Sequence, residues 1–464
     1  MKMKNSARLA VVSVLAGGFI SSTVSAAGFA LIENSASGMG NAFAGGSAIA
    51  EDGSTVWFNP AGMTRLKGEQ ISVAGHFIST TADFTNQGST NAAGGALAGP
   101  EDDGGTSALV PNFYYVKQLE GSAWFGVGVT VPFGLSTDYD ENWVGRYGAT
   151  KSEVQAININ PSFAFKHNDD LAIGLGLNLQ YIEATLENKI DSALTCVGLM
   201  QAAGQDQATA FATCGGAGFV PGDATQDSAQ SLEGDDWNWG WNAGLLYDLD
   251  DSSRLGLAYR SSMDANLSGE VDFTVNAGLQ GFIDTAFAGT PLINVLTDSG
   301  INAGIELPAQ ISLSYVRDVN ADFTVMADIT WTEWSNFNAL VVKFDNLVQP
   351  TSTTPENWED SYRFAIGASY KTSDAMVLRV GLAQDQTPIP SAEDRTARIP
   401  GDERTWLSLG MGYDIDEKTT IDVGYSHLFV DDVKINNTDG FGHTLIGEYE
   451  ADVDILSVQG TFKF

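Results

Sequence analysis

Beyond its first 26 residues, this sequence has no apolar run long enough to cross a bilayer as a helix, which takes about 20 consecutive residues. A helical membrane protein is therefore excluded. Basic residues are scarce as well, with 23 Lys and Arg against 58 Asp and Glu, and the formal net charge is −35. Because phosphate contacts need clustered Lys and Arg, nucleic acid is excluded as a partner.

Cysteine and histidine are the other scarce residues. The two cysteines, Cys196 and Cys214, lie in one long connection without nearby histidine partners, so we expect no metal site. In an oxidising compartment we expect them to form a disulfide, which stabilises a closed loop of this size by roughly 3 kcal/mol. None of the four histidines belongs to a recognisable nucleophile motif, so we expect neither an enzyme nor a bound cofactor.

The first 26 residues have the composition of a secretory signal peptide. Lys2, Lys4 and Arg8 precede an apolar run over residues 9–20, and a Val-Ser-Ala triplet ending at Ala26 supplies small residues for cleavage. We therefore expect export, with the mature chain starting directly after this triplet.

From residue 69 to residue 464, the chain consists of short segments in which apolar and polar residues alternate. Such alternation predicts strands that have one apolar face. One such row has aromatic residues at both ends: Trp237, Trp239, Trp241, Ala243, Leu245 and Tyr247. A strand of this length rises about 24 Å at a tilt of about 45°, close to the ~25 Å apolar band of outer-membrane barrels. We therefore expect these faces to meet lipid.

Fourteen such segments are joined by connections that alternate between six tight polar turns and seven long loops. The segments begin near residues 69, 108, 122, 151, 170, 231, 252, 304, 320, 358, 374, 401, 417 and 448. The long loops are expected at residues 82–107, 132–150, 190–230, 264–303, 335–357, 385–400 and 430–447. Short turns on one side and long extracellular loops on the other predict an all-β fold, a 14-stranded antiparallel transmembrane β-barrel over residues 69–464.

Residues 27–68 do not alternate, and they are rich in glycine and serine. A segment of this size ahead of the first strand suits an N-terminal hatch in the barrel lumen. Apolar residues such as Phe29, Phe43 and Trp57 argue against the alternative, a disordered periplasmic tail.

Ordered motifs along the whole mature chain resemble the FadL-type long-chain fatty acid transporters of the Gram-negative outer membrane. They comprise Ala27-Gly28-Phe29, Ser37-Gly38-Met39-Gly40, Ala48-Ile49-Ala50-Glu51-Asp52, Asn59-Pro60-Ala61, Trp241-Asn242-Ala243-Gly244, Trp334-Ser335-Asn336-Phe337, Thr387-Pro388-Ile389-Pro390 and Arg404-Thr405-Trp406-Leu407-Ser408. The resemblance implies a fourteen-stranded barrel with a hatch that takes up long-chain fatty acids passively. It also implies a monomer in contact with outer-membrane lipid and lipopolysaccharide.

The resemblance also suggests a lateral exit at strand three. Pro132, Phe133 and Gly134 match the kinked third strand of the family. Pro132 removes a hydrogen-bond donor and Gly134 offers no side chain to pack, so the wall is weakened there. The alternative is that strand three ends at Val131 and that these residues begin the second long loop.

Two loops are candidates for capturing the ligand. The second long loop carries Trp143, Val144 and Tyr147, and residues 194–220 are an apolar, helical-looking hairpin that includes Phe211. The alternative is that these apolar residues only pack the loops together.

The ligand head group needs a cation. The family has an arginine late in strand five and a lysine after the Trp-Ser-x-Phe segment, but Asn188 and Val341 occupy these places here. Lys189 and Lys343 are the nearest substitutes in the sequence. In a regular strand, however, the Lys189 side chain would face the lipid. Phe29 matches a family residue near the pocket, with plain packing of the hatch as the alternative.

Several alternatives stay open. A neutral hydrophobic compound, such as an aromatic hydrocarbon or an alkane, would follow the same route. The apolar N-terminal segment argues against a diffusion porin. Arg395 and Arg398, with Asp402, Glu403 and Arg404, are expected to form ion pairs at the barrel mouth, with ligand steering as the alternative.

Overall fold

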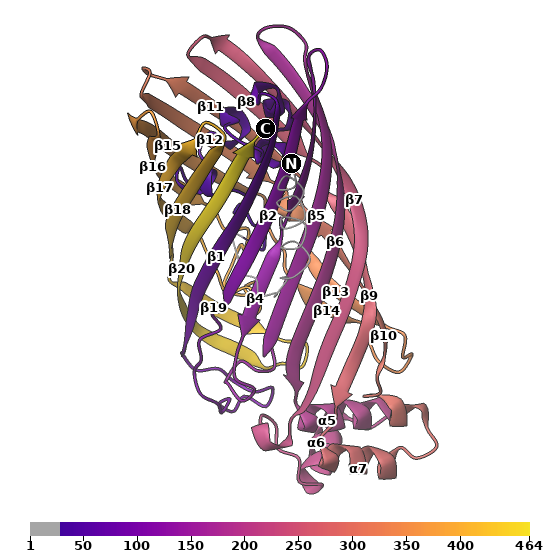
Figure 1. Ribbon diagram of the computed structural model, residues 1–464. Helices are drawn as coiled ribbons and strands as arrows, with labels where there is room; N and C mark the ends of the chain where they lie inside the picture. The colour runs from indigo at the N-terminus through magenta and orange to yellow at the C-terminus, as the bar shows by residue number, and fades with distance from the viewer. Residues whose placement is uncertain (1–27) are drawn as a thin grey trace, which may run out of the picture.

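The computed structural model describes residues 28–464 and shows a closed antiparallel β-barrel (Figure 1). The expected signal peptide lies outside the described residues. Strand β1 (Glu69–Asn86) pairs with β20 (Thr444–Lys463) from Gln70 opposite Lys463 to Asn86 opposite Gly447, which closes the barrel. Closure leaves no open sheet edge, as a lipid environment requires.

Within residues 28–464, the strands form fourteen barrel strands, and this confirms the predicted fold class. The continuous ones are β1, β2 (Ser107–Gln118), β5 (Lys151–Lys166), β6 (Leu171–Ile190), β7 (Ser228–Asp250), β16 (Met376–Asp385), β17 (Arg404–Asp416) and β20. The others consist of two pieces: β3 (Ala123–Thr130) with β4 (Gly134–Asp138), β8 (Ser253–Arg260) with β9 (Met263–Thr274), β10 (Ser299–Leu307) with β11 (Gln310–Asp318), β12 (Phe323–Thr332) with β13 (Ala339–Phe344), β14 (Ser352–Pro355) with β15 (Ser361–Ser373), and β18 (Thr419–Val430) with β19 (Val433–Thr438).

The barrel wall extends further at the long-loop end than the sequence predicted. The expected loop 264–303 is wrong in extent, because β9 continues to Thr274 and β10 begins at Ser299. In β9 the apolar residues Ala265 and Leu267 are buried inside, while Asp264 and Asn266 are exposed. This extension lies beyond the lipid band, so its outer face is polar. It therefore lacks the outward row of apolar residues by which the other strands were predicted.

The outer face of the barrel carries the predicted apolar rows. Trp237, Trp239 and Trp241 in β7 are 62%, 68% and 46% exposed, although tryptophan is normally well buried in a folded protein. Between them, Asn238 and Asn242 face inward and are buried. A barrel in lipid needs this arrangement, in which apolar side chains point out and polar or small ones point in.

The N-terminal segment, residues 28–68, lies inside the barrel. It contains short helices: α2 (Ala36–Met39), α3 (Gly46–Ile49), α4 (Thr55–Phe58) and η1 (Pro60–Arg65). These helices contact strands on different sides of the wall: α2 packs on β17 and β18, α3 on β8 and β11, and η1 on β5, β6 and β7. In Figure 1 they are the indigo coils within the barrel, toward the end opposite α5, α6 and α7.

Inward-facing glycines allow this close approach. A Cβ at Gly381 would collide with the backbone of Asn41, and one at Gly256 would collide with the carbonyl of Ser47. The Asn59 amide donates to the carbonyl oxygens of Ser47 at 2.6 Å and of Leu245 at 2.9 Å, so it ties the segment to β7.

The remaining helices lie in the loops: α5 (Ser192–Ala202), α6 (Gln207–Gly216), η2 (Ala224–Gln226), α7 (Ala277–Ala286), η3 (Pro291–Asn294) and η4 (Trp334–Asn336). A disulfide joins Cys196 of α5 to Cys214 of α6. None of the helices within residues 28–464 has both the length and the apolar character needed to cross a bilayer.

Candidate functional site

A large cavity opens at the long-loop end of the barrel. This loop cavity has a volume of 1050 Å³. Its apolar lining includes Leu194, Val197 and Phe211 from the α5–α6 hairpin, with Leu292 and Val295 from the neighbouring loop. Loops from distant parts of the sequence thus enclose an apolar chamber above the barrel wall.

A smaller, mainly apolar cavity of 70 Å³ lies deeper and is called here the inner cavity. Phe29 lines it together with residues of the barrel wall, among them Leu135, Val154 and Leu267. Both cavities share the lining residues Leu186, Leu232, Leu340, Val342 and Arg398. The two cavities therefore meet at a boundary marked by one cation.

Arg398 is held at this boundary by the ends of the wall strands. Its guanidinium donates to the carbonyl oxygen of Lys151 and to the hydroxyl of Ser152, both at 3.1 Å, and to Oδ1 of Asn188 at 3.2 Å. None of these partners is charged. Burial lowers the pKa of Arg398 to about 10, which keeps the side chain cationic at neutral pH.

Two acids, Glu233 and Glu356, line the inner cavity together with Arg398. Burial raises the pKa of Glu356 to about 8, against the opposing effect of Arg398. Arg398 therefore places a cation in a largely apolar setting at the boundary between the cavities, where the head group of an amphiphilic anion could bind.

Phe29 closes the inner cavity with an aromatic cluster. Its ring centroid lies 4.9 Å from that of Trp334, 5.8 Å from that of Trp358 and 5.9 Å from those of Phe133 and Phe337. Trp334 and Phe133 also line a cavity on the other side of this cluster. Phe29 thus stands between two chambers.

Strand three is interrupted beside this cluster. The three residues 131–133 separate β3 from β4, and β4 then pairs with β5 again, Gly134 opposite Gln155. The N-terminal segment fills the interruption: the Leu31 amide donates to the Pro132 carbonyl at 2.8 Å, and the Gly134 amide donates to the Phe29 carbonyl at 2.9 Å. The structure therefore has an interrupted strand at the predicted kink.

On one side of the interruption, strand three is no longer paired with its neighbour β2. The pairing of β2 with β3 ends at Phe113 opposite Val129, although β2 itself starts at Ser107. Behind this stretch the Asn112 amide donates to the carbonyl oxygen of Glu33 at 3.0 Å. The backbone of the N-terminal segment thus lies directly behind the unpaired part of the wall.

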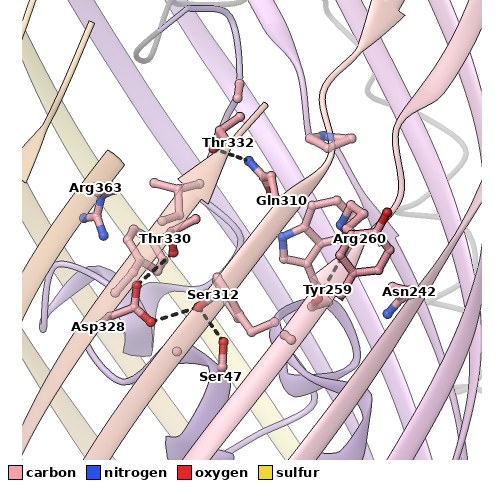
Figure 2. A pocket seen from close by; sticks show the side chains of 18 of the residues that line it. Ser47, Asn242, Tyr259, Arg260, Gln310, Ser312, Asp328, Thr330, Thr332 and Arg363 are labelled. Atoms are coloured by element: carbon pink, nitrogen blue, oxygen red, sulfur yellow. Dashed lines mark hydrogen bonds between the residues drawn. The ribbon is translucent and has the colours of Figure 1, made fainter. Parts of the chain in front are cut away.

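The third chamber, called here the lumen cavity, has a volume of 110 Å³ and a lining of both apolar and polar residues (Figure 2). Arg363 and Asp328 lie on one side of it in Figure 2, and Tyr259 and Arg260 lie on the other. Pro132 also lines it, so the lumen cavity reaches the interruption of strand three.

Two of the predicted ligand-binding lysines lie away from these chambers. Lys189 forms an ion pair with Glu141 at 2.6 Å, and Lys343 is exposed beside the buried Val342. Neither lines the loop cavity or the inner cavity. Their positions favour another cation, and Arg398, assigned to ion pairing at the mouth, is the one that reaches both cavities.

The two predicted capture residues differ in position. Phe211 lines the loop cavity. Trp143 is fully buried between the loops, stacks on Tyr139 with ring centroids 4.1 Å apart, and donates from Nε1 to the Ala149 carbonyl. This position matches the alternative in which Trp143 packs the loops together.

Comparison with known proteins decides the family. Residues 17–464 match the model of the family described as outer membrane protein transport protein (OMPP1/FadL/TodX). The chain belongs to this FadL/OmpP1 family. It is 31% identical over 427 residues to the long-chain fatty acid transport protein of Escherichia coli K12, covering 90% of this chain and 91% of that protein. It is 30% identical over 451 residues to outer membrane protein P1 of Haemophilus influenzae, covering 92% and 90%.

Solved structures of the family agree with the fold. A Pseudomonas aeruginosa FadL homologue superposes with a TM-score of 0.84 at 25% identity, covering 94% of this chain and 100% of that one. The Pseudomonas putida toluene transporter TodX superposes with a TM-score of 0.65 at 20% identity, covering 89% and 94%, and so supports the fold alone. This FadL-family chain is an outer-membrane transporter of hydrophobic compounds, and it is not an enzyme.

Proposed function

We propose that this protein takes up long-chain fatty acids across the outer membrane by passive diffusion through three chambers. The loop cavity captures the acyl chain, Arg398 receives the carboxylate at the boundary of the inner cavity, and the interruption of strand three is the lateral exit. The N-terminal segment acts as the hatch that closes the axial route.

Arg398 is the observation that carries this proposal. A neutral apolar ligand would need no cation at the junction of these two cavities, and the hydrogen-bond partners of the Arg398 guanidinium are neutral, so its charge is available to an anion. The relatives named as long-chain fatty acid transport proteins agree with an acidic ligand.

The energetics favour several weak sites over one deep pocket. A chain of ~16 methylenes carries roughly 13 kcal/mol of gross transfer free energy at ~0.8 kcal/mol each. If all of this appeared as affinity, release would be too slow for uptake. Chambers in series, separated by the ring of Phe29, divide this free energy into smaller steps.

A neutral hydrophobic compound, such as an aromatic hydrocarbon or an alkane, is the second candidate. The nearly complete apolar lining of the inner cavity favours it, because only Glu233, Glu356 and Arg398 carry ionisable groups there.

Uptake by cells separates the two candidates. A Gram-negative strain that lacks its own fatty acid transporter, given this gene, should accumulate radiolabelled hexadecanoate and grow on it as the sole carbon source. The same cells should be tested with labelled hexadecane and toluene. Accumulation of these neutral compounds with no gain in hexadecanoate would overturn the fatty acid assignment and favour the second candidate.

A further inference from the structure

Three neighbouring strands of the barrel carry a row of buried charged residues beside the lumen cavity. Arg363 in β15 lies opposite Asp385 in β16, and Asp385 lies opposite Arg404 in β17. Glu33 of the N-terminal segment interacts electrostatically with all three. These four side chains belong to residues that are at most 7% exposed. Direct cross-strand partners have Cβ atoms about 5 Å apart, so the four groups share one small volume.

Several polar atoms of this cluster have no hydrogen-bond partner among the described residues. Nε and Nη1 of Arg363, Nε and Nη1 of Arg404, and Oε2 of Glu33 have no hydrogen-bond partner within residues 28–464. Leaving a buried donor or acceptor without a partner is energetically unfavourable. Five such atoms in one place are available to bind a polar group.

Arg363 is nevertheless held in a fixed position. Its Nη2 donates to the Ala42 carbonyl at 2.7 Å, and its guanidinium lies 5.1 Å from the centroid of the Trp406 ring. This anchoring leaves the other edge of the guanidinium for a ligand. Arg363 and Asp385 both line the lumen cavity, which extends to Pro132 and Phe133 at the interruption of strand three.

The unpartnered donors of Arg363 and Arg404 suit a group with two acceptor oxygens, while Asp385 and Asp328 supply the nearby negative charges. The two guanidinium groups present four unpartnered nitrogen donors, and a carboxylate accepts such charge-assisted hydrogen bonds strongly. Burial raises the pKa of Glu33 to about 7, against the effects of its own backbone and of Arg404 and Arg363, while Asp385 acts in the same direction as burial. In its protonated form Glu33 donates a hydrogen bond and does not repel an anion.

We propose that Arg363 and Arg404, with Glu33, form a second carboxylate site on the exit side of Phe29, which receives the fatty acid head group after it leaves Arg398. The inference rests on the proposed fatty acid uptake and adds an intermediate site to it. The acid passes from one cation to the next and reaches the opening in strand three with its charge still compensated.

A ligand with a heavy atom next to its carboxylate tests the site directly. We expect crystals of the full-length mature protein soaked with 2-bromohexadecanoate to show anomalous bromine density within about 5 Å of the Arg363 guanidinium, the range of a direct contact. Bromine density beside Arg398, with only water or a solvent anion at the cluster, would overturn the second site and leave the proposed uptake intact.

Uptake by variants supplies an independent test. Arg363→Gln should lower hexadecanoate uptake by about tenfold and leave hexadecanol uptake within about twofold, because only the acid needs the cation, and tenfold corresponds to about 1.4 kcal/mol. Arg363→Lys should restore much of the acid uptake. Arg379→Gln is the matched control, since Arg379 is also a buried lumen arginine but is paired with Asp422 at 2.7 Å and Glu51 at 3.0 Å.

The outcomes separate the two proposals. Equal losses in Arg363→Gln and Arg379→Gln, or equal losses for acid and alcohol, would mean a structural role for Arg363 and would overturn the site. Heat-modifiable migration on gels checks that each variant barrel is folded. Absence of hexadecanoate uptake by the wild-type protein would overturn the proposed function, and the second site with it.

Discussion

At the scale of single residues, Arg398 has the most direct consequence for ligand choice. It lies at the junction of the loop cavity and the inner cavity and has no charged hydrogen-bond partner. Its contribution to binding should therefore depend on the charge of the ligand and little on the length of the apolar chain.

We expect Arg398→Gln to weaken hexadecanoate binding to the purified protein by about ten- to a hundredfold, as a lost hydrogen bond between charged groups contributes about 1.5–3 kcal/mol. Binding of hexadecanol should change by less than about threefold. Isothermal titration in detergent measures both, with Lys343→Gln as the control because Lys343 is exposed outside the cavities. An equal loss for the acid and the alcohol would argue against a head-group role.

His443 makes the loops sensitive to pH. Its Nδ1 lies 2.9 Å from Asp439, its Nε2 lies 3.1 Å from Asp191, and its ring stacks on Tyr147 with centroids 4.1 Å apart. Burial alone would lower the pKa of His443, but the hydrogen bonds to Asp191 and Asp439 raise it from 6.5 to about 9. The protonated histidine therefore joins two loops.

The raised pKa of His443 predicts that the contact between the two loops weakens as the pH rises. The contribution of His443 is complete below pH 6.5 and is lost as the pH rises through about 9. Opening of loop 439–443 should increase by about tenfold per pH unit in this window. Hydrogen exchange corrected for intrinsic rates measures it, and His443→Gln should remove the dependence. A flat profile in the wild-type protein would contradict the prediction.

At the scale of elements, the interruption of strand three carries the proposed exit. Residues 131–133 lie opposite two residues of β5, Ala156 and Ile157, so strand three has one residue more than its partner. The N-terminal segment supplies hydrogen bonds that the wall lacks here, which explains why the interruption is compatible with a stable barrel.

Removing the extra residue should close the wall. Deletion of Phe133 together with Pro132→Thr restores a regular register between strand three and β5, and we expect hexadecanoate uptake to fall by at least about tenfold, since strand pairing blocks lateral passage. The cell uptake assay measures this, and heat-modifiable migration shows whether the barrel is intact. Unchanged uptake in a folded variant would argue for an axial route.

At the scale of the whole molecule, the N-terminal segment and the wall are matched by small residues. Glycines of the inner face lie against the backbone of the segment, as Gly381 does against Asn41. A barrel of fourteen strands would otherwise enclose an open lumen. The low ion conductance expected of such a protein depends on this fit.

A bulky side chain at Gly381 tests the fit. Gly381→Val should displace the segment and raise single-channel conductance in planar bilayers several-fold, because water enters a lumen that the segment no longer fills. Gly304→Val is the matched control, since a Cβ at Gly304 in β10 meets nothing within 4 Å. Equal conductance in the two variants would show that the segment does not seal the lumen.

Local patterns in the sequence were enough to predict the barrel. Alternation along each strand has a period of two residues, so the outward rows of β7 and its neighbours could be identified without tertiary information. The number of barrel strands and the alternation of turns and loops followed from the same signal. Extensions such as β9 were missed because their outer face lies beyond lipid and is polar.

The site depended on contacts that no local pattern encodes. Arg398 reaches the cavities because Lys151, Ser152 and Asn188, which are more than 200 positions away in the sequence, meet it at the ends of β5 and β6. Lys189 and Lys343 were predicted because they are close in sequence to the family positions. Lys189 instead pairs with Glu141, and Lys343 lies on the exposed face of its strand. The sequence by itself determined which side of the wall each residue faces; only the closed barrel decided which inward-facing charges share a chamber, because closure brings together strands from opposite ends of the chain.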